Sequence, residues 1–197
     1  MSSNPDIHQE KILILDFGSQ YTQLIARRLR ETGVYCEIRP FDLKEGIARK
    51  FSPMGIILSG GPESVTELKS ESETLAAPAY VFELGVPVLG ICYGMQTMAK
   101  QLGGEVAESN KREFGYARVE VMSDSALISE LSDGGSVDPY LEVWMSHGDT
   151  ILSIGDGYEV ICSTNDVEHA GFRSKTEQVW GIQFHPEVWH STEGPIL

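Results

Sequence analysis

The fold is indicated most clearly by one stretch, PVLGICYGMQTMAKQLGG, which runs from Pro87 to Gly104. Its first part, Pro87 to Ile91, is a short apolar run of the kind that a strand buried on both faces shows. Apolar residues then recur at helical spacing from about Gly94 to Leu102, and two glycines follow where a helix would end. The stretch therefore predicts a strand that turns directly into a helix, with Cys92 at the turn.

The same alternation of strand and helix precedes this stretch in the chain. Apolar runs predict strands, and residues at helical spacing or with a capping residue such as Asp42 predict helices. The expected elements are a strand over Lys11 to Asp16, a helix over Gln20 to Thr32, a strand over Val34 to Arg39, a short helix after Asp42 and a strand over Gly55 to Ser59. This order is typical of an α/β protein with a central parallel sheet and flanking helices.

Beyond Gly104 the pattern changes to strands of mixed alternation, without helices between them. We expect these strands over Ala117 to Met122, Leu141 to Met145, Glu159 to Ser163, His169 to Phe172 and Gln178 to Phe184. Without crossover helices they are expected to add antiparallel strands to a mostly parallel sheet. The polar stretch from Glu63 to Thr74 is interpreted as a surface loop.

Length and composition limit the classes of protein that fit. The chain has 197 residues, enough for one sizeable core, and we expect a tail over residues 1–10 and one domain over residues 11–197. A formal charge of −14 argues against nucleic acid as a partner. The start lacks a signal sequence, and no apolar run approaches the roughly 18 residues that span a membrane. A cytoplasmic protein with no membrane partner is expected.

The chemistry concentrates around Cys92. A nucleophile on a sharp turn between a strand and a helix needs glycines two residues to either side, because a Cβ there would collide with the backbone, and Gly90 and Gly94 meet that need. The turn also sets the sulfur at a helix N-terminus, which favours a thiolate. The alternative is an ordinary buried cysteine, and we expect that role for Cys36 and Cys162. The cysteine spacing predicts neither a disulfide framework nor a metal site.

A cysteine nucleophile needs a base, and the base needs a group that orients it. His185 and Glu187 follow the last expected strand, at the sheet edge where Cys92 also lies. With Pro186 fixing the backbone between them, the imidazole could face Cys92 while Glu187 accepts a hydrogen bond from the other ring nitrogen. Taken singly, His185 is more often a hydrogen-bonded strand-end histidine and Glu187 a solvated carboxylate.

Several of these motifs together resemble the class I glutamine amidotransferases over nearly the whole chain. They are the turn around Cys92 continuing to Gln96, the Gly60-Gly61 turn and His185-Pro186-Glu187. Within this family, four segments resemble the GMP synthetase branch: Asp16 to Tyr21, Ser59 to Ser64, Cys92 to Gln96 and Trp144 to Asp149. The resemblance implies the family's three-layer α/β fold and the release of ammonia from glutamine.

The resemblance also implies a role for each catalytic residue. Cys92 would attack the glutamine carboxamide and form a thioester, His185 would give a proton to the departing ammonia and later activate water, and Glu187 would orient His185. The backbone N–H groups of Gly61 and Tyr93 would stabilise the oxyanion.

Glutamine itself would be held, by the same resemblance, by Gln96, Ser146, His147 and Asp149, with Asp149 the natural partner of the ammonium group. For His147 a core role stays open, and Gly148-Asp149 is also typical of a turn.

The branch further implies a partner. The ammonia would serve the ATP-dependent amination of xanthosine monophosphate to GMP in an ATP-pyrophosphatase domain, of the same or a separate chain, which would bind ATP and Mg²⁺. We expect no cofactor and no metal in the present chain. The Ser59 to Ser64 turn looks like a nucleotide loop, but we assign no nucleotide binding to it because Pro62 removes a backbone donor. We expect this chain to be a fragment, cut before its last helix, of a longer protein that forms a homodimer.

Two other functions stay open. A self-contained hydrolase of γ-glutamyl compounds would share the cysteine turn and a histidine, although Gln96 and the position of Glu187 speak against it. A catalytically silent glutamine-binding module would regulate a partner, although the presence of Cys92, His185 and Glu187 speaks against silence by residue loss.

Overall fold

The computed structural model describes residues 10–66, 75–123, 125–128, 140–176 and 178–191. One nine-stranded sheet dominates this part of the chain. The strands that pair in parallel are β1 (Lys11–Asp16), β2 (Tyr35–Pro40), β3 (Gly55–Leu58), β4 (Val88–Ile91) and β9 (Val179–Ile182). The remaining strands are β5 (Glu105–Val121), β6 (Tyr140–Ser153), β7 (Tyr158–Ser163) and β8 (Gly171–Ser174). The helices are α1 (Thr22–Glu31), α2 (Glu45–Phe51), α3 (Tyr80–Glu83) and α4 (Tyr93–Gln101).

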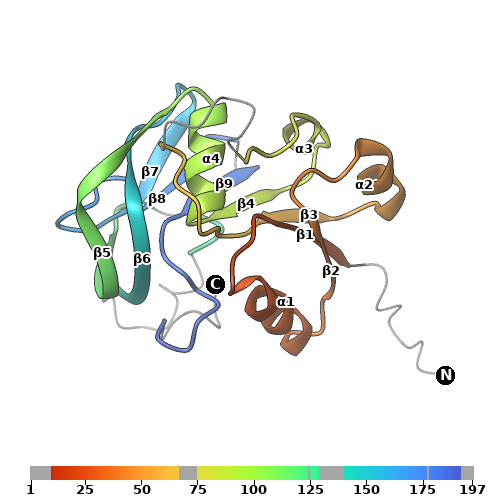
Figure 1. The fold of residues 1–197 in the computed structure, drawn as a ribbon, viewed down its shortest axis with the longest axis horizontal. Coiled ribbons are helices and arrows are strands. Elements are labelled where there is room, and N and C mark those ends of the chain that lie inside the picture. The colour runs from red at the N-terminus through yellow and green to blue at the C-terminus, as the bar shows by residue number, and fades with distance from the viewer. Residues whose placement is uncertain (1–9, 67–74, 124, 129–139, 177, 192–197) are drawn as a thin grey trace.

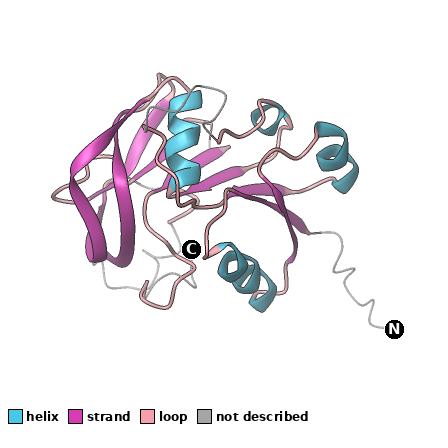
Figure 2. Cartoon of the chain, in the orientation of Figure 1, coloured by secondary structure: helices cyan, strands magenta, loops and turns pink. Residues whose placement is uncertain are grey.

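The strands follow the order β2-β1-β3-β4-β9-β8-β7-β5-β6 across the sheet (Figures 1 and 2). From β2 to β9 every pairing is parallel, and from β9 to β6 every pairing is antiparallel. The last strand, β9, inserts beside β4 and joins the two halves. The expected fold class, a parallel core with flanking helices and added antiparallel strands, is confirmed.

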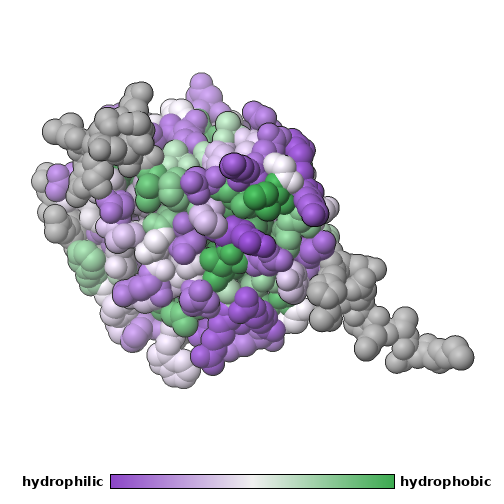
Figure 3. All heavy atoms as spheres, turned by 45° about the vertical axis from the view of Figure 1, so that its right-hand side comes forward, coloured by the Kyte–Doolittle hydropathy of each residue, from purple (hydrophilic) through white to green (hydrophobic). Residues whose placement is uncertain are grey.

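Helices cover both faces of the parallel part, which gives the three layers that the resemblance implied. Helix α1 lies on one face, whereas α2, α3 and α4 lie on the other (Figure 1). Alternate residues of β1 accordingly enter two separate apolar cores: Leu13 and Leu15 pack with α4, and Ile14 packs with α1. On the face shown in Figure 3, hydrophilic residues predominate and hydrophobic residues form only small separate patches.

The structure corrects some of the expected elements. Strands β5 and β6 form a long hairpin. Strand β5 begins at Glu105 rather than at the expected Ala117, and β6 ends at Ser153 rather than at the expected Met145. The added parts were missed because the outer face of the hairpin is exposed and carries no regular apolar signal. Lys44, not Asp42, precedes the first residue of α2. The short helix α3 was not predicted. Of the expected loop from Glu63 to Thr74, residues 67–74 lie outside the described residues, and Val65 is buried.

The carboxyl ends of the parallel strands meet at one edge of the sheet and bring distant segments together. Residues 17–21 follow β1, residues 59–61 follow β3, Cys92 follows β4 and His185 follows β9. In open α/β sheets this edge is where ligands bind. The fold therefore places all these segments around Cys92.

Candidate active site

Cys92 occupies a strained turn between β4 and α4. Its backbone has φ 52° and ψ −110°, and it is the residue that precedes the first turn of α4. Among the described non-glycine residues, only Cys92 and Ser52 have positive φ. Such strain persists where the surroundings impose it, and it is frequent at functional sites. The N–H of Cys92 donates to the carbonyl of Ile182 at 2.8 Å, which ties the turn to β9.

The two glycines beside this turn have no room for a side chain. A Cβ at Gly90 would lie 2.8 Å from backbone atoms of Gly94 and Met95, and a Cβ at Gly94 would lie 2.3 Å from the carbonyl oxygen of Leu58 in β3. Both distances are shorter than nonbonded carbon contacts allow. The prediction that Gly90 and Gly94 are required by close backbone approach is confirmed.

His185 and Glu187 lie beside Cys92, as predicted. Nδ1 of His185 lies 2.8 Å from Oε1 of Glu187, and the side chain of Cys92 is close enough to His185 to raise its pKa. Both His185 and Glu187 are buried, at 3% exposure each, so Glu187 is not a solvated carboxylate. The three side chains form a chain from sulfur to imidazole to carboxylate.

Electrostatics favours the protonated form of His185. Burial by itself lowers the pKa of His185, because the imidazolium loses hydration, but the hydrogen bonds and negative charges of Cys92 and Glu187 outweigh burial and raise the pKa to about 10. Protonated His185 can stabilise a thiolate at Cys92 and can donate a proton to a leaving group.

Trp144 of β6 and Ser191 hold the backbone of His185 by hydrogen bonds to its N–H and its carbonyl. Its N–H donates to the carbonyl of Trp144 at 3.0 Å, and its own carbonyl accepts the hydroxyl of Ser191 at 2.6 Å. The Ser191 oxygen also accepts the N–H of Trp144 at 3.1 Å. Ser191 is buried and uses its hydroxyl as donor and acceptor at once, so it links His185 to β6.

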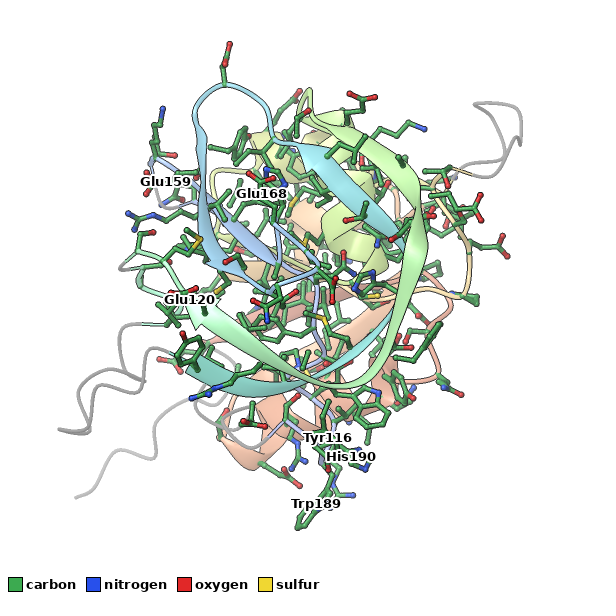
Figure 4. All side chains as sticks on the ribbon, turned by 90° about the vertical axis from the view of Figure 1, so that its left-hand side faces the viewer. Tyr116, Glu120, Glu159, Glu168, Trp189 and His190 are labelled. Atoms are coloured by element: carbon green, nitrogen blue, oxygen red, sulfur yellow. The ribbon has the colours of Figure 1, made fainter. Side chains whose placement is uncertain are left out.

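Three aromatic rings pack together next to the hydrogen bonds of Trp144 and Ser191. The ring of Trp144 lies 4.5 Å from that of His190, and Tyr116 contacts both rings edge-on. Tyr116, His190 and the exposed Trp189 lie near one another in Figure 4. On the inner side, the ring of Tyr21 meets His185 edge-on at 5.3 Å. His185 is thus fixed by its backbone hydrogen bonds and by its contact with the ring of Tyr21.

We expect replacement of Ser191 by alanine to lower kcat for ammonia release about 10- to 100-fold, because small displacements of a catalytic group are costly. KM should change little. Without the hydroxyl, the hydrogen bonds that raise the pKa of His185 weaken, so the fall of activity at alkaline pH should begin at lower pH. Ser191→Thr, which keeps the hydroxyl, should restore most of the rate.

Ser125→Ala is the matched control for Ser191→Ala. Ser125 is equally buried, and its oxygen accepts the indole N–H of Trp180 at 3.1 Å, whereas the hydroxyl of Ser191 bonds to the backbone of His185. Both variants should lose about 1 to 3 kcal/mol of unfolding free energy. If Ser125→Ala lowers kcat and moves the pH profile as much as Ser191→Ala does, the positioning role of Ser191 is wrong.

The glycine turn after β3 faces Cys92 and His185. A Cβ at Gly61 would lie 2.9 Å from the carbonyl oxygen of Phe17, and one at Gly60 would lie 3.3 Å from Cε1 of His185. Glycine therefore lets this backbone approach the site closely. Gly61 and Tyr93 both line the cavity at Cys92, where their N–H groups are predicted to hold an oxyanion.

The side chain of Tyr93 has a structural role that sequence analysis missed. Its ring is buried against Phe17, with 5.5 Å between ring centroids, and its hydroxyl donates to the carbonyl of Leu75 at 2.8 Å. Burial raises the pKa of Tyr93 to about 12. Only the backbone of Tyr93 is therefore available for oxyanion binding.

A cavity of about 280 Å³ opens beside the sulfur of Cys92. Every residue predicted to hold glutamine lines this cavity. The lining residues are Gly61, Pro62, Glu63, Ser64, Cys92, Tyr93, Gln96, Phe114, Ser146, His147, Gly148 and Asp149. The carbonyl oxygen of Ser146 lies 3.5 Å from the sulfur. The predicted glutamine-binding residues are thus brought together, although their contacts with glutamine stay a prediction.

Within this cavity the polar groups hold one another in place. The amide of Gln96 donates to the carbonyl of Asp149 at 3.0 Å and to the side chain of Gln183 at 3.1 Å. Nδ1 of His147 lies 2.9 Å from the same carbonyl, and His147 is buried. His147 therefore combines the two roles left open, a core position and a place in the cavity wall.

The carboxylate of Asp149 anchors the segment after the glycine turn. Ser64 and Thr66 donate their hydroxyl groups to it at 2.7 and 2.9 Å, and Val65 donates its N–H at 2.8 Å. Asp149 lies within β6, so the interpretation of Gly148-Asp149 as a turn is wrong. A carboxylate has about four acceptor positions, and three of those of Asp149 are used. One is left for an ammonium group, and the role of Asp149 as ammonium partner stays a prediction.

Ser191, Gln183 and Thr66 are site residues that sequence analysis missed. Gln183 and Thr66 bond to partners far away in the chain, and Ser191 bonds to the backbone of His185. None of the three belongs to a sequence motif whose spacing indicates a site. Tyr21 belonged to a segment quoted for the resemblance, but its contact with His185 was not foreseen. These contacts follow from the tertiary structure alone.

The other two cysteines are core residues, as predicted. Cys36 and Cys162 are buried and free of disulfides, and burial raises the pKa of both thiols, that of Cys162 to about 12. In the described part of the chain, no three acidic, cysteine or histidine side chains are grouped to bind a metal ion. None of its helices has the length and apolar character needed to cross a membrane.

Two curated relatives are similar to nearly the whole chain. The GMP synthase [glutamine-hydrolyzing] of Pectobacterium carotovorum subsp. carotovorum is 57% identical over 96% of the chain, and that of Alteromonas mediterranea is 58% identical over 98%. The chain spans only 36% of the length of either relative.

Solved structures and a family model agree with this similarity. The crystal structure of a candidate GMP synthase subunit from Thermoplasma acidophilum matches 94% of the chain, and 88% of its own length, with a TM-score of 0.82 and 32% identity. A glutamine amidotransferase from Thermotoga maritima, at 24% identity and a TM-score of 0.68 over 91% of this chain and 76% of its own, shares the fold. The model of the family "Glutamine amidotransferase class-I" matches residues 13–197. The chain therefore belongs to the class I glutamine amidotransferases.

Proposed function

We propose that this chain hydrolyses glutamine to glutamate and ammonia, as the glutaminase part of a GMP synthase. The observation that carries the proposal is the strained turn that presents Cys92, at a helix N-terminus, to His185, which Glu187 holds by a hydrogen bond, and to a polar cavity of about 280 Å³. The high identity to GMP synthases over this part of their length supports the choice of branch.

The first half of the reaction forms the thioester. The Cys92 thiolate attacks the side-chain carbonyl carbon of glutamine, and the resulting oxyanion accepts hydrogen bonds from the N–H groups of Gly61 and Tyr93. His185 gives its proton to the amide nitrogen, the C–N bond breaks and ammonia leaves. Glu187 holds the ring of His185 so that its other nitrogen faces the sulfur.

The second half restores the enzyme. Neutral His185 takes a proton from water, whose oxygen attacks the thioester carbonyl carbon. The C–S bond breaks, the thiolate reforms beside the protonated ring, and glutamate leaves. Gln96, Ser146, His147 and Asp149 would hold the amino and carboxylate groups of glutamine throughout, with the remaining acceptor position of Asp149 facing the ammonium group.

The ammonia would serve ATP-dependent amination of xanthosine monophosphate in a synthetase domain that binds ATP and Mg²⁺. The present chain would contribute no nucleotide site, because the Ser59 to Ser64 turn that looks like a nucleotide loop borders Cys92 instead. Homodimerisation of the longer protein stays a prediction.

The test is release of ammonia by the purified chain from glutamine, asparagine and γ-glutamyl peptides, followed by acid quenching and mass spectrometry of the Cys92 peptide. We expect turnover of glutamine and a glutamyl adduct on Cys92. Preference for γ-glutamyl peptides would favour the self-contained hydrolase. Glutamine binding by calorimetry with neither turnover nor adduct, even with an ATP-loaded synthetase protein present, would favour the silent module.

A further inference from the structure

Gln183 is a buried polar residue to which the proposed reaction has given no role. It follows the last residue of β9 and is completely buried. Its Oε1 accepts a hydrogen bond from Nε2 of Gln96, in α4, at 3.1 Å. Its own Nε2 is also buried and has no hydrogen-bond partner among the described residues. What the side chain offers to this part of the chain is thus its acceptor oxygen, and that oxygen faces Gln96.

Packing alone does not favour an amide at this position. A buried amide whose N–H groups are unpaired is destabilising, and an apolar side chain of similar volume would avoid that cost. The hydrogen bond to Gln96 is therefore the property that distinguishes Gln183 from an ordinary core residue.

This hydrogen bond, together with one to Asp149, decides which way the amide of Gln96 faces. The backbone carbonyl of Asp149 can only accept, so the atom of Gln96 that lies 3.0 Å from it has to be the nitrogen. That nitrogen has two hydrogens, of which one goes to Asp149 and the other to Gln183. Gln96 lines the cavity at Cys92, and with both hydrogens used it offers the cavity its carbonyl oxygen alone.

An acceptor in the cavity wall favours a ligand that places a donor there. Of the two charged groups of glutamine, the ammonium group donates hydrogen bonds, whereas the carboxylate only accepts them. Hydrogen bonds to charged groups are stronger than those between neutral groups. An N–H of Gln96 turned toward the cavity would instead repel the ammonium group. The orientation of the Gln96 amide therefore separates amino acid amides from amides without the amino group.

We propose that Gln183 is a specificity-determining residue that acts through Gln96, by holding the Gln96 amide so that Oε1 accepts an N–H of the substrate's ammonium group. The proposal rests on the proposed function. Loss of the Gln183 oxygen leaves the Gln96 amide with its bond to Asp149, about which it can pivot and turn its freed N–H into the cavity. Selection for the ammonium group then weakens, although no atom that touches the substrate has been removed.

The test compares glutamine with glutaramate, which has hydrogen in place of the amino group, by the ratio of their kcat/KM values for ammonia release. Gln183→Leu should lower this ratio about tenfold, the effect of losing one hydrogen bond to a charged group, through a higher KM for glutamine. Gln183→Met, which fills the same space with a flexible apolar chain, should behave alike. Gln183→Glu keeps an acceptor oxygen of the same reach and should keep the ratio within about threefold.

Two further measurements separate positioning from a structural effect. Because Gln183→Leu also removes the unpaired N–H groups, its midpoint of urea unfolding should stay equal or rise. If Gln183 acts through Gln96, adding Gln183→Leu to Gln96→Leu should change the ratio less than about twofold, because the amide that Gln183 holds is already gone.

Thr97→Val is the matched control. Thr97 is the next residue of α4, is buried, donates its hydroxyl to the carbonyl of Leu75 at 3.1 Å and does not line the cavity. This variant loses a buried hydrogen bond of similar length, so it should be less stable but keep the ratio of the unmodified chain.

A ratio that stays within about twofold of the unmodified chain in Gln183→Leu overturns the proposal, as do equal effects of Gln183→Leu in the presence and absence of the Gln96 amide. A fall of the same size in Thr97→Val overturns it too. An unmodified chain that releases no ammonia from glutamine and forms no adduct on Cys92 would instead contradict the proposed function, which separates the two failures.

Discussion

Replacement of Cys92 by alanine is expected to lower ammonia release from glutamine by about 10⁶-fold, the order seen when the nucleophile of a catalytic triad is removed. The sulfur is the atom that His185 faces and that borders the cavity, and no other described cysteine lies there. The glutamyl adduct should vanish with it. A coupled assay of ammonia release measures the first effect, and acid quenching with mass spectrometry of the peptide that contains position 92 measures the second.

Cys162→Ala is the control for this variant. Cys162 is completely buried in the core, and burial raises the pKa of its thiol to about 12, so it should contribute nothing to turnover. Its loss should affect stability alone. Turnover that survives in Cys92→Ala, or that disappears in a folded Cys162→Ala, would show that the nucleophile has been wrongly identified.

Replacement of Gly94 by alanine is expected to have the largest effect on stability. The added methyl group would lie 2.3 Å from the carbonyl oxygen of Leu58, a backbone atom in the centre of the sheet that cannot turn away as a side chain would. Either α4 moves away from β3 or the sheet distorts, and we expect a loss of about 3 kcal/mol or more of unfolding free energy. Urea unfolding followed by circular dichroism measures the loss.

Gly46→Ala separates a steric effect from the general effect of removing glycine. Gly46 lies in α2, and a Cβ there would meet no atom within 4 Å. This variant should be neutral or more stable by up to about 1 kcal/mol, because alanine favours the helix. Similar destabilisation of both variants would contradict the close approach of α4 to β3.

Because residual Gly94→Ala protein would carry a displaced helix, its activity should fall more than its folded fraction explains. The helix α4 begins directly after Cys92, and the N–H of Tyr93 belongs to its first turn. A shift of α4 therefore moves the nucleophile and one predicted oxyanion donor together. Full activity per folded molecule would show that the turn at Cys92 tolerates a displacement of α4.

The parallel core, and the closeness of Cys92 to His185 and Glu187, could be predicted from the sequence because both depend on local patterns. Buried strands are short apolar runs, and the expected and observed limits of β1 coincide at Lys11 and Asp16. The glycines around Cys92 mark a backbone that has to fold back on itself, and the spacing of His185 and Glu187 is short enough to be recognised within one motif.

The remaining contacts of the site could not be predicted from the sequence, because they join residues far apart in the chain or run through the backbone. Gln183 meets Gln96 across 87 residues, Thr66 meets Asp149 across 83 residues, and Ser191 acts through a backbone bond to His185, which depends on no side-chain motif. The extent of the β5–β6 hairpin and the full lining of the cavity at Cys92 were also not predicted from the sequence. Local propensity sets which residues form strands and turns, whereas the neighbours of a buried polar group are set by how those elements pack.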